Sequence, residues 1–262
     1  MIKEIKLTTG YWVSHVFLLL LIISGAKASY GQTGKKNDNP SVNEIITTNP
    51  EGMGISLTID FQKGPAHNHP LMAIWIEDTE GRYLQTLYVS RSVARGVFDY
   101  GDHSTGKWKP GEILRPAALP YWSHKRNVLN DKGNYMPRPG FEVADALSGA
   151  TPRAGFRLLT RTDTVTGKKF RVLCEINQSW DWNNHWTNTM YPEDAEYKTS
   201  SQPAVVYAGE IDPTIEGIIV SLVPIGRSHH SGADGKLYND LETLTTALKI
   251  ASEITVTVSQ HK

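Results

Sequence analysis

The stretch Ile55-Ser56-Leu57-Thr58-Ile59-Asp60-Phe61 alternates apolar with polar side chains. A period of two predicts a β-strand that buries one of its faces. Residues 71–76 follow as a continuous apolar run, which is typical of a strand buried on both faces. The turn at residues 80–81 leads into another strand at 83–89. We therefore expect the strands at 71–76 and 83–89 to form a hairpin.

The same pattern continues outward from this hairpin. Short apolar runs that predict strands occur at 156–159, 170–176, 205–211, 218–223 and 254–258. Near the end, residues 241–251 place apolar side chains on one face of a short helix, capped by Asn239 or Asp240. Seven or eight short strands predict an all-β fold, a single antiparallel β-sandwich of immunoglobulin-like architecture. A partly open barrel is the alternative.

A long excursion without apolar periodicity separates the hairpin from the later strands. It runs from Ser90 to Phe141 and is rich in Gly, Pro, His and Trp. Connections of this length in a compact domain usually carry function. We therefore predict long irregular loops that include Trp108, Trp122 and His124.

Composition bounds the class of protein. The chain has 262 residues with 39% apolar content, enough for a packed core. Lys and Arg total 27, as do Asp and Glu, and no dense basic block occurs, so we expect no nucleic-acid partner. The single cysteine, Cys174, lies in a strand-like run, which favours a buried structural position over a catalytic thiol.

The N-terminus has the pattern of a secretory signal peptide. Lys3 and Lys6 precede an apolar core at 16–23, and Ala26-Lys27-Ala28 is a small-x-small cleavage site. We predict a signal peptide at 1–28, a flexible polar leader at 29–45 and the β-sandwich domain at 46–262. The protein is then periplasmic or extracellular. An uncleaved membrane anchor is the alternative.

One segment carries a resemblance to a flavin-attachment sequence. Residues 145–153 read Asp-Ala-Leu-Ser-Gly-Ala-Thr-Pro-Arg. Their first seven positions resemble Asp-x-x-Ser-Gly-Ala-Thr-x-Thr, the acceptor motif of substrates of FAD:protein FMN transferases. In that motif the last threonine carries the flavin, and here Arg153 stands in its place without a hydroxyl. Thr151 is the alternative acceptor, and an ordinary turn between strands is the structural interpretation.

Larger anchors resemble a family of predicted periplasmic proteins. They are the segments at 69–78, 145–155, 202–207 and 240–247, within a region of roughly residues 50 to 258. In this order they look like the family called domain of unknown function 2271. The resemblance implies export, a β-rich domain and genetic association with the flavin transferase and with PepSY-type membrane proteins. It implies no established reaction.

A dense aromatic cluster is the candidate ligand platform. It contains Trp180, Trp182 and Trp186, beside the amides of Asn183 and Asn184. Indoles suit the flat face of an isoalloxazine ring, a sugar or a partner protein. The alternative is a loop that packs its indoles against the sandwich. Histidines are scattered without the spacing of a zinc or haem site, so no metal ligands are assigned.

These observations lead to one functional expectation and one alternative. We expect an exported binding or accessory component of flavin-based extracytoplasmic electron transfer, with no covalent cofactor and no independent enzymatic activity. Its partner is expected to be a PepSY-type membrane redox protein or a flavin transferase system. The alternative is an electron carrier with FMN esterified to Thr151.

Overall fold

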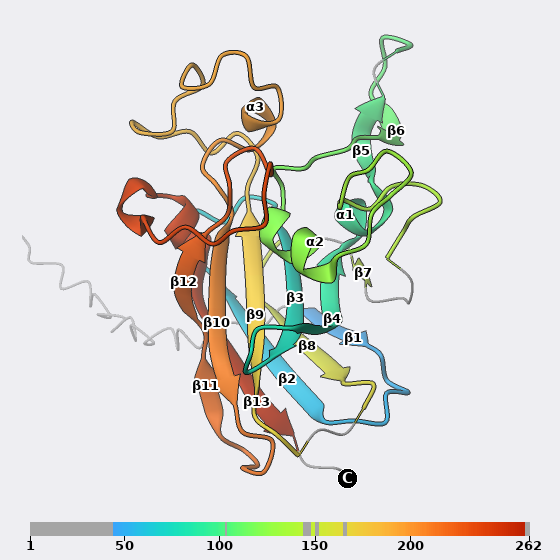
Figure 1. The fold of residues 1–262 in the computed structure, drawn as a ribbon, viewed down its shortest axis with the longest axis vertical. Helices are drawn as coiled ribbons and strands as arrows, with labels where there is room; N and C mark the ends of the chain where they lie inside the picture. Colours follow the sequence, from blue (N-terminus) through green and yellow to red (C-terminus); the bar gives the residue numbers. More distant parts are fainter. Residues whose placement is uncertain (1–43, 103, 144–147, 150–151, 165–166, 260–262) are drawn as a thin grey trace, which may run out of the picture. The chain divides into compact units, whose positions relative to one another are not determined.

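Two β-sheets pack face to face in the structure (Figure 1). The computed structural model describes residues 44–102, 104–143, 148–149, 152–164 and 167–259. The predicted signal peptide, most of the predicted leader and Thr151 lie outside the described residues. The all-β sandwich predicted from the sequence is confirmed, whereas its finer description as immunoglobulin-like stays a prediction.

The first sheet has five strands in the order β1-β8-β2-β13-β11. Their bounds are β1 Glu44–Thr48, β8 Phe156–Arg161, β2 Ser56–Lys63, β13 Ala251–Ser259 and β11 Ile219–Ser221. All pairs are antiparallel except β1 with β8. Because β1 already includes Glu44 and Ile45, the sandwich begins before residue 46, where the sequence placed its start.

The second sheet has six strands in the order β12-β10-β9-β3-β4-β7. Their bounds are β12 Val223–Arg227, β10 Val205–Ile211, β9 Phe170–Asn177, β3 Leu71–Asp78, β4 Tyr83–Ser90 and β7 Ser148–Gly149. The predicted hairpin of β3 and β4 is confirmed. The short β7 pairs in parallel with the end of β4.

The core lies between the two sheets. From β2, Leu57, Ile59 and Phe61 face inward, as the alternation predicts, and Phe61 stacks on Phe156 at 5.2 Å between ring centroids. From the opposite sheet, alternate residues of β3 and β9 meet them, including Cys174, which is fully buried as predicted. This is the packing expected of a sandwich, in which inner faces interdigitate.

The outer face of the six-stranded sheet is covered as well. The excursion that the sequence predicted as irregular contains α1 Arg91–Arg95, the hairpin of β5 Val97–Asp102 with β6 Lys109–Glu112, and α2 Pro120–Arg126. A second apolar cluster joins Trp75 and Leu173 of the sheet to Trp122 of α2. This cover explains why β3 is buried on both faces.

A buried carboxylate fixes α2 on the sheet. Glu175 of β9 accepts hydrogen bonds from the backbone N–H groups of Tyr121 (3.2 Å) and Trp122 (2.7 Å), and from the Ser228 hydroxyl. These N–H groups belong to the first turn of the helix, where no intrahelical acceptor exists. Burial raises the pKa of Glu175 to about 7, although these donors oppose the rise.

Two parts of the chain differ from the sequence prediction. The expected strand at 218–223 is split, because buried Leu222 lies between β11 and β12, which belong to different sheets. The expected C-terminal helix is present as two single-turn 3-10 helices, Leu241–Thr243 and Ala247–Lys249, and Ala251 already starts β13. Asp240 lies at the cap position, but its carboxylate pairs with Arg227 at 2.7 Å.

The side chains of Asn183 and Gln202 explain why the C-terminal helix is interrupted. The Asn183 amide donates to the Thr243 carbonyl at 2.9 Å, and the Gln202 side chain accepts the Thr245 N–H at 2.8 Å. Both bonds use backbone groups that a continuous helix would pair within itself.

Among the described residues, none of the helices has the length and apolar character that a membrane crossing requires.

The strand directions place the loop before β3 and the loops after β4 and β9 at one end of the six-stranded sheet. The start of β3 and the ends of β4 and β9 share this end, since Leu71 pairs with Asn177 and Ala73 with Val89. The helix α1, the β5–β6 hairpin and α3 (Tyr197–Ser200) continue from it (Figure 1). Binding residues of β-sandwiches commonly lie on such clustered loops.

Candidate functional site

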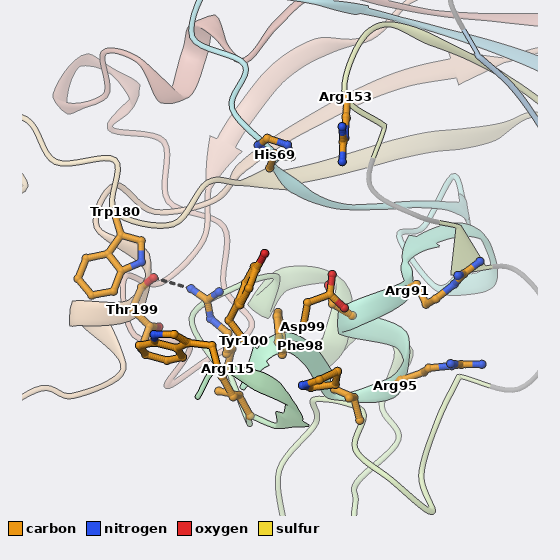
Figure 2. Close-up of a pocket in the computed structure, with 15 residues that line it drawn as sticks. His69, Arg91, Arg95, Phe98, Asp99, Tyr100, Arg115, Arg153, Trp180 and Thr199 are labelled. Carbon is orange, nitrogen blue, oxygen red and sulfur yellow. Dashed lines mark hydrogen bonds between the residues drawn. The ribbon is translucent and has the colours of Figure 1, made fainter. Parts of the chain in front are cut away.

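A cavity of about 1130 Å³ opens at this end of the sheet (Figure 2). Its walls come from the loop before β3, from α1, from the β5–β6 hairpin and from the segments around residues 115, 153, 180 and 199. Segments far apart in the sequence therefore share one space. Its volume is sufficient for a ligand of cofactor size.

Arginines give the cavity its charge. Arg91 and Arg95 are four residues apart on α1, so they share a helix face, and Arg153 enters from the segment between β7 and β8. All three side chains are exposed. None has a carboxylate oxygen within 4.0 Å among the described residues, and Asp99 is the one acidic residue of the described lining. Glu142, outside the lining, interacts electrostatically with Arg95, and within the described lining the arginines outnumber the single carboxylate.

A fourth arginine has a structural place in the wall. The Arg115 guanidinium donates to the Ser179 hydroxyl at 2.8 Å and to the Thr199 carbonyl, and it lies over the Phe98 ring at 5.4 Å. Burial lowers its pKa, yet an arginine stays protonated under all ordinary conditions. Arg115 thus joins the loop that follows β9 to α3 and to the β5–β6 hairpin.

Aromatic side chains line the same space. Tyr100 is 73% exposed, Trp108 66% and Trp180 72%, although large apolar rings are normally withdrawn from water. Tyr100 and Trp108 belong to the β5–β6 hairpin and Trp180 to the turn after β9. Exposed rings concentrated in a cavity are typical of a binding surface.

Two lining residues have strained backbones. Trp180 has φ of 64° and His69 has φ of 53°, in the left-handed region that non-glycine residues avoid. His69 also precedes Pro70, which restricts its backbone further. The two residues lie next to the paired ends of β9 and β3, where Asn177 pairs with Leu71. Such strain persists only where the surroundings enforce it and gathers at functional sites.

The structure separates the three tryptophans of the predicted platform. Trp180 lines the cavity, whereas Trp186 is only 2% exposed and Trp182 packs partly buried against the sandwich core. Both contact the Tyr197 ring, at centroid distances of 6.3 and 5.6 Å. Trp186 also donates its indole N–H to Thr243 at 3.2 Å. Trp182 and Trp186 therefore pack the loop down, and Trp180 alone of the three remains available to a ligand.

The side-chain amide of Asn183, beside these tryptophans, forms hydrogen bonds within the protein. Asn183 accepts the N–H groups of His185 and Trp186 through its side-chain oxygen and donates to Gln202 and Thr243. Its hydrogen-bonding capacity is used to hold the loop.

Described residues of the acceptor-like segment lie near or in the cavity wall. Ser148 and Gly149 form β7 beside the end of β4, and Arg153 lines the cavity itself. Thr151 lies outside the described residues, so its suggested role as a flavin acceptor stays a prediction. Sequence reasoning singled out Arg153 for its missing hydroxyl. It did not predict that Arg153 would join Arg91 and Arg95, because the three are scattered along the chain without a motif.

His229 and His230 pack against neighbouring rings. His230 stacks on Tyr191 at 4.0 Å and on His229 at 4.2 Å between ring centroids. Burial lowers the pKa of His230 to about 4, with a smaller contribution from His229. Within the described ranges, no three side chains of His, Cys, Asp or Glu gather in a way that suits a metal ion.

The cavity thus combines exposed arginine side chains with exposed aromatic rings. Comparison of the chain with known protein families, with curated proteins and with solved structures finds no match. The function of the protein is therefore inferred from its sequence and from the chemistry of its cavity.

Proposed function

We propose that this protein is an exported binding protein, an accessory component of flavin-based electron transfer outside the cytoplasm, and that its cavity holds an anionic ligand. The observation that carries the proposal is that Arg91, Arg95 and Arg153 line one cavity, and that none of them forms an ion pair within 4.0 Å of a carboxylate among the described residues. We propose no reaction for it.

The physical support is the cost of gathering like charges. The chain as a whole is formally neutral, with 27 basic and 27 acidic residues, so the cluster is a local feature and not a consequence of composition. Like charges at neighbouring positions of a helix repel one another, as Arg91 and Arg95 do on α1. An anion relieves this repulsion, and guanidinium groups bind phosphate and carboxylate groups through two parallel hydrogen bonds.

The redox setting of the proposal comes from the sequence. A signal peptide and the resemblance to the domain of unknown function 2271 family favour a place outside the cytoplasm, beside a PepSY-type membrane redox protein or a flavin transferase system. The segment that resembles the flavin acceptor motif ends at Arg153, which lines the cavity. Arg153 therefore belongs both to the segment that resembles the flavin acceptor motif and to the lining of the cavity.

The direct test is calorimetric titration of the mature protein with inorganic pyrophosphate. We expect binding by the native protein and at least about tenfold weaker binding by the double variant Arg91→Ala/Arg95→Ala, because charge-assisted hydrogen bonds each contribute about 1.5–3 kcal/mol. Higher salt should weaken the native interaction, since the arginines are exposed.

The control removes equal charge elsewhere. Arg82 and Lys169 are exposed at the opposite end of the six-stranded sheet, next to the start of β4 and the start of β9. The variant Arg82→Ala/Lys169→Ala should bind pyrophosphate as the native protein does. Absence of pyrophosphate binding, or equal weakening in both double variants, would contradict the proposed cavity.

The electron-carrier alternative has its own test. Thr151, which lies outside the described residues, precedes Arg153 by two positions in the sequence. In cells that express the flavin transferase, a carrier should gain the mass of one FMN, and Thr151→Ala should abolish that gain. An unchanged intact mass would exclude the carrier and leave the noncovalent proposal in place.

A further inference from the structure

We propose that the ligand of this cavity is a nucleotide, whose phosphate lies at Arg91, Arg95 and Arg153 and whose flat heteroaromatic ring lies against Trp180. This inference rests on the proposed function and deepens it, because it names the chemical class of the anion. It is carried by the arrangement of charge and aromatic surface inside one cavity.

The cationic and aromatic walls are separated in space. Figure 2 shows Arg91 and Arg95 on one side of the cavity and Trp180 on the opposite side. The first two come from α1 and the third from the turn after β9. A small free anion would occupy only the arginine side. A ligand that meets both walls needs an anionic group and an apolar surface at some distance from each other.

The two residues that precede Trp180 are held in place by hydrogen bonds. Ser179, the preceding residue, accepts a hydrogen bond from Arg115 at 2.8 Å, and Gln178 accepts the Asn68 N–H at 2.7 Å. These bonds anchor the segment that leads into Trp180, whose φ is 64° and whose side chain is 72% exposed. Packing of the indole within the protein therefore offsets little of the strain. Stacking of a ligand on the exposed indole would offset more of it.

A second ring faces the same space. Tyr100 of β5 projects between the Trp180 side and the arginine side of the cavity (Figure 2). Its ring is 73% exposed. Flat heteroaromatic rings stack on aromatic side chains regardless of their exact identity. The cavity thus offers a nucleobase or an isoalloxazine more than one aromatic face.

The lining favours a nucleotide over an acidic sugar. Sugar hydroxyls require acceptors, and in the described lining these are few: Asp99 is the one carboxylate, and no Asn or Gln is present. Ser92 and Thr199 add two hydroxyl-bearing residues. Arginine forks instead match the doubly charged phosphate of a nucleotide.

The test compares five-carbon sugar or sugar-alcohol phosphates that carry a flat heteroaromatic ring with one that does not. We expect AMP and FMN to bind the mature protein at least about tenfold more tightly than ribose 5-phosphate, because stacking of a base on an aromatic side chain is commonly worth that much. The variant Trp180→Ala should lose this advantage and bind AMP about as weakly as ribose 5-phosphate. Trp180→Phe should retain most of it.

Two further measurements separate this inference from the proposed function. Pyrophosphate should bind Trp180→Ala as it binds the native protein, which also shows that the variant is folded. If pyrophosphate binds but AMP and FMN bind no more tightly than ribose 5-phosphate, or if Trp180→Ala weakens all ligands equally, the nucleotide is excluded and the anion site stands. Tighter binding of a galacturonate trimer than of AMP would also overturn the inference. If pyrophosphate does not bind, the proposed function itself fails.

Discussion

Trp180 combines a strained backbone with an exposed side chain. Its backbone lies in the left-handed region, which costs a non-glycine residue about 1–2 kcal/mol, and its ring is 72% exposed. A residue chosen for packing would not combine strain with exposure. The same position occupied by glycine would be relaxed.

We therefore predict that Trp180→Gly leaves the free energy of unfolding unchanged or raises it by up to about 1 kcal/mol, because relief of strain offsets the greater freedom of glycine in the unfolded chain. Urea denaturation measures this. The matched control is Trp186→Ala, which empties a buried site and should lower the free energy by about 3–5 kcal/mol. A loss above about 2 kcal/mol in Trp180→Gly would show that Trp180 is a packing residue.

The sequence grouped three tryptophans as one candidate platform, whereas the structure separates them. Trp180, Trp182 and Trp186 have the same chemistry and lie within seven residues. What separates them is the turn at Trp180 and the anchoring of Asn183 to Thr243, and both depend on contacts with distant segments. Local pattern alone does not contain that information.

At the scale of elements, α2 depends on one carboxylate of the sheet beneath it. Glu175 is fully buried and accepts the N–H groups of Tyr121 and Trp122 in the first turn of the helix. Its pKa is about 7 in the folded protein against an ordinary value of 4.5, with burial as the main cause. The folded state therefore binds more protons than the unfolded state between these two pH values.

Glu175 makes the stability of the fold depend on pH in one direction. The stability associated with protonated Glu175 is fully present below pH 4.5 and is lost as the pH rises to about 7. We expect a loss of about 3 kcal/mol across this window in the native protein. The variant Glu175→Gln, which cannot ionise, should show a shallower decline when urea denaturation is repeated between pH 4.5 and 7.5.

Comparison with another variant isolates this effect. Glu210 lies on β10 with an exposed side chain, so Glu210→Gln should retain the native pH profile. Partly buried His230, whose pKa is lowered, contributes an opposite slope, and its contribution is the same in all three proteins. Equal slopes in the native protein and Glu175→Gln would contradict this role of Glu175.

Strands were more predictable than the connections between them. The alternation at 55–61 and the apolar run at 71–76 identify β2 and β3, because burial of one or both faces leaves a direct mark on the sequence. The split at Leu222 leaves no such mark, since a strand that changes sheets keeps its apolar residues in one run. The interrupted C-terminal helix depends on Gln202 and Asn183, far earlier in the chain.

At the scale of the sandwich domain, the fold explains how a neutral chain makes a charged cavity. Strands β3, β4 and β9 bring their loops to one end of a sheet whose two faces are already buried. Side chains that the core does not need, including Arg91, Arg153 and Trp180, are thereby gathered there. The fold class was predictable from patterning, whereas the cavity required the pairing of strands distant in sequence.

The most direct test is a crystal structure of the mature protein with AMP at a concentration that saturates binding in solution. We predict the phosphate within hydrogen-bonding distance of the guanidinium groups of Arg91, Arg95 or Arg153, and the adenine stacked on Trp180. An empty cavity under those conditions, or AMP bound at another surface, would contradict the proposed nucleotide site.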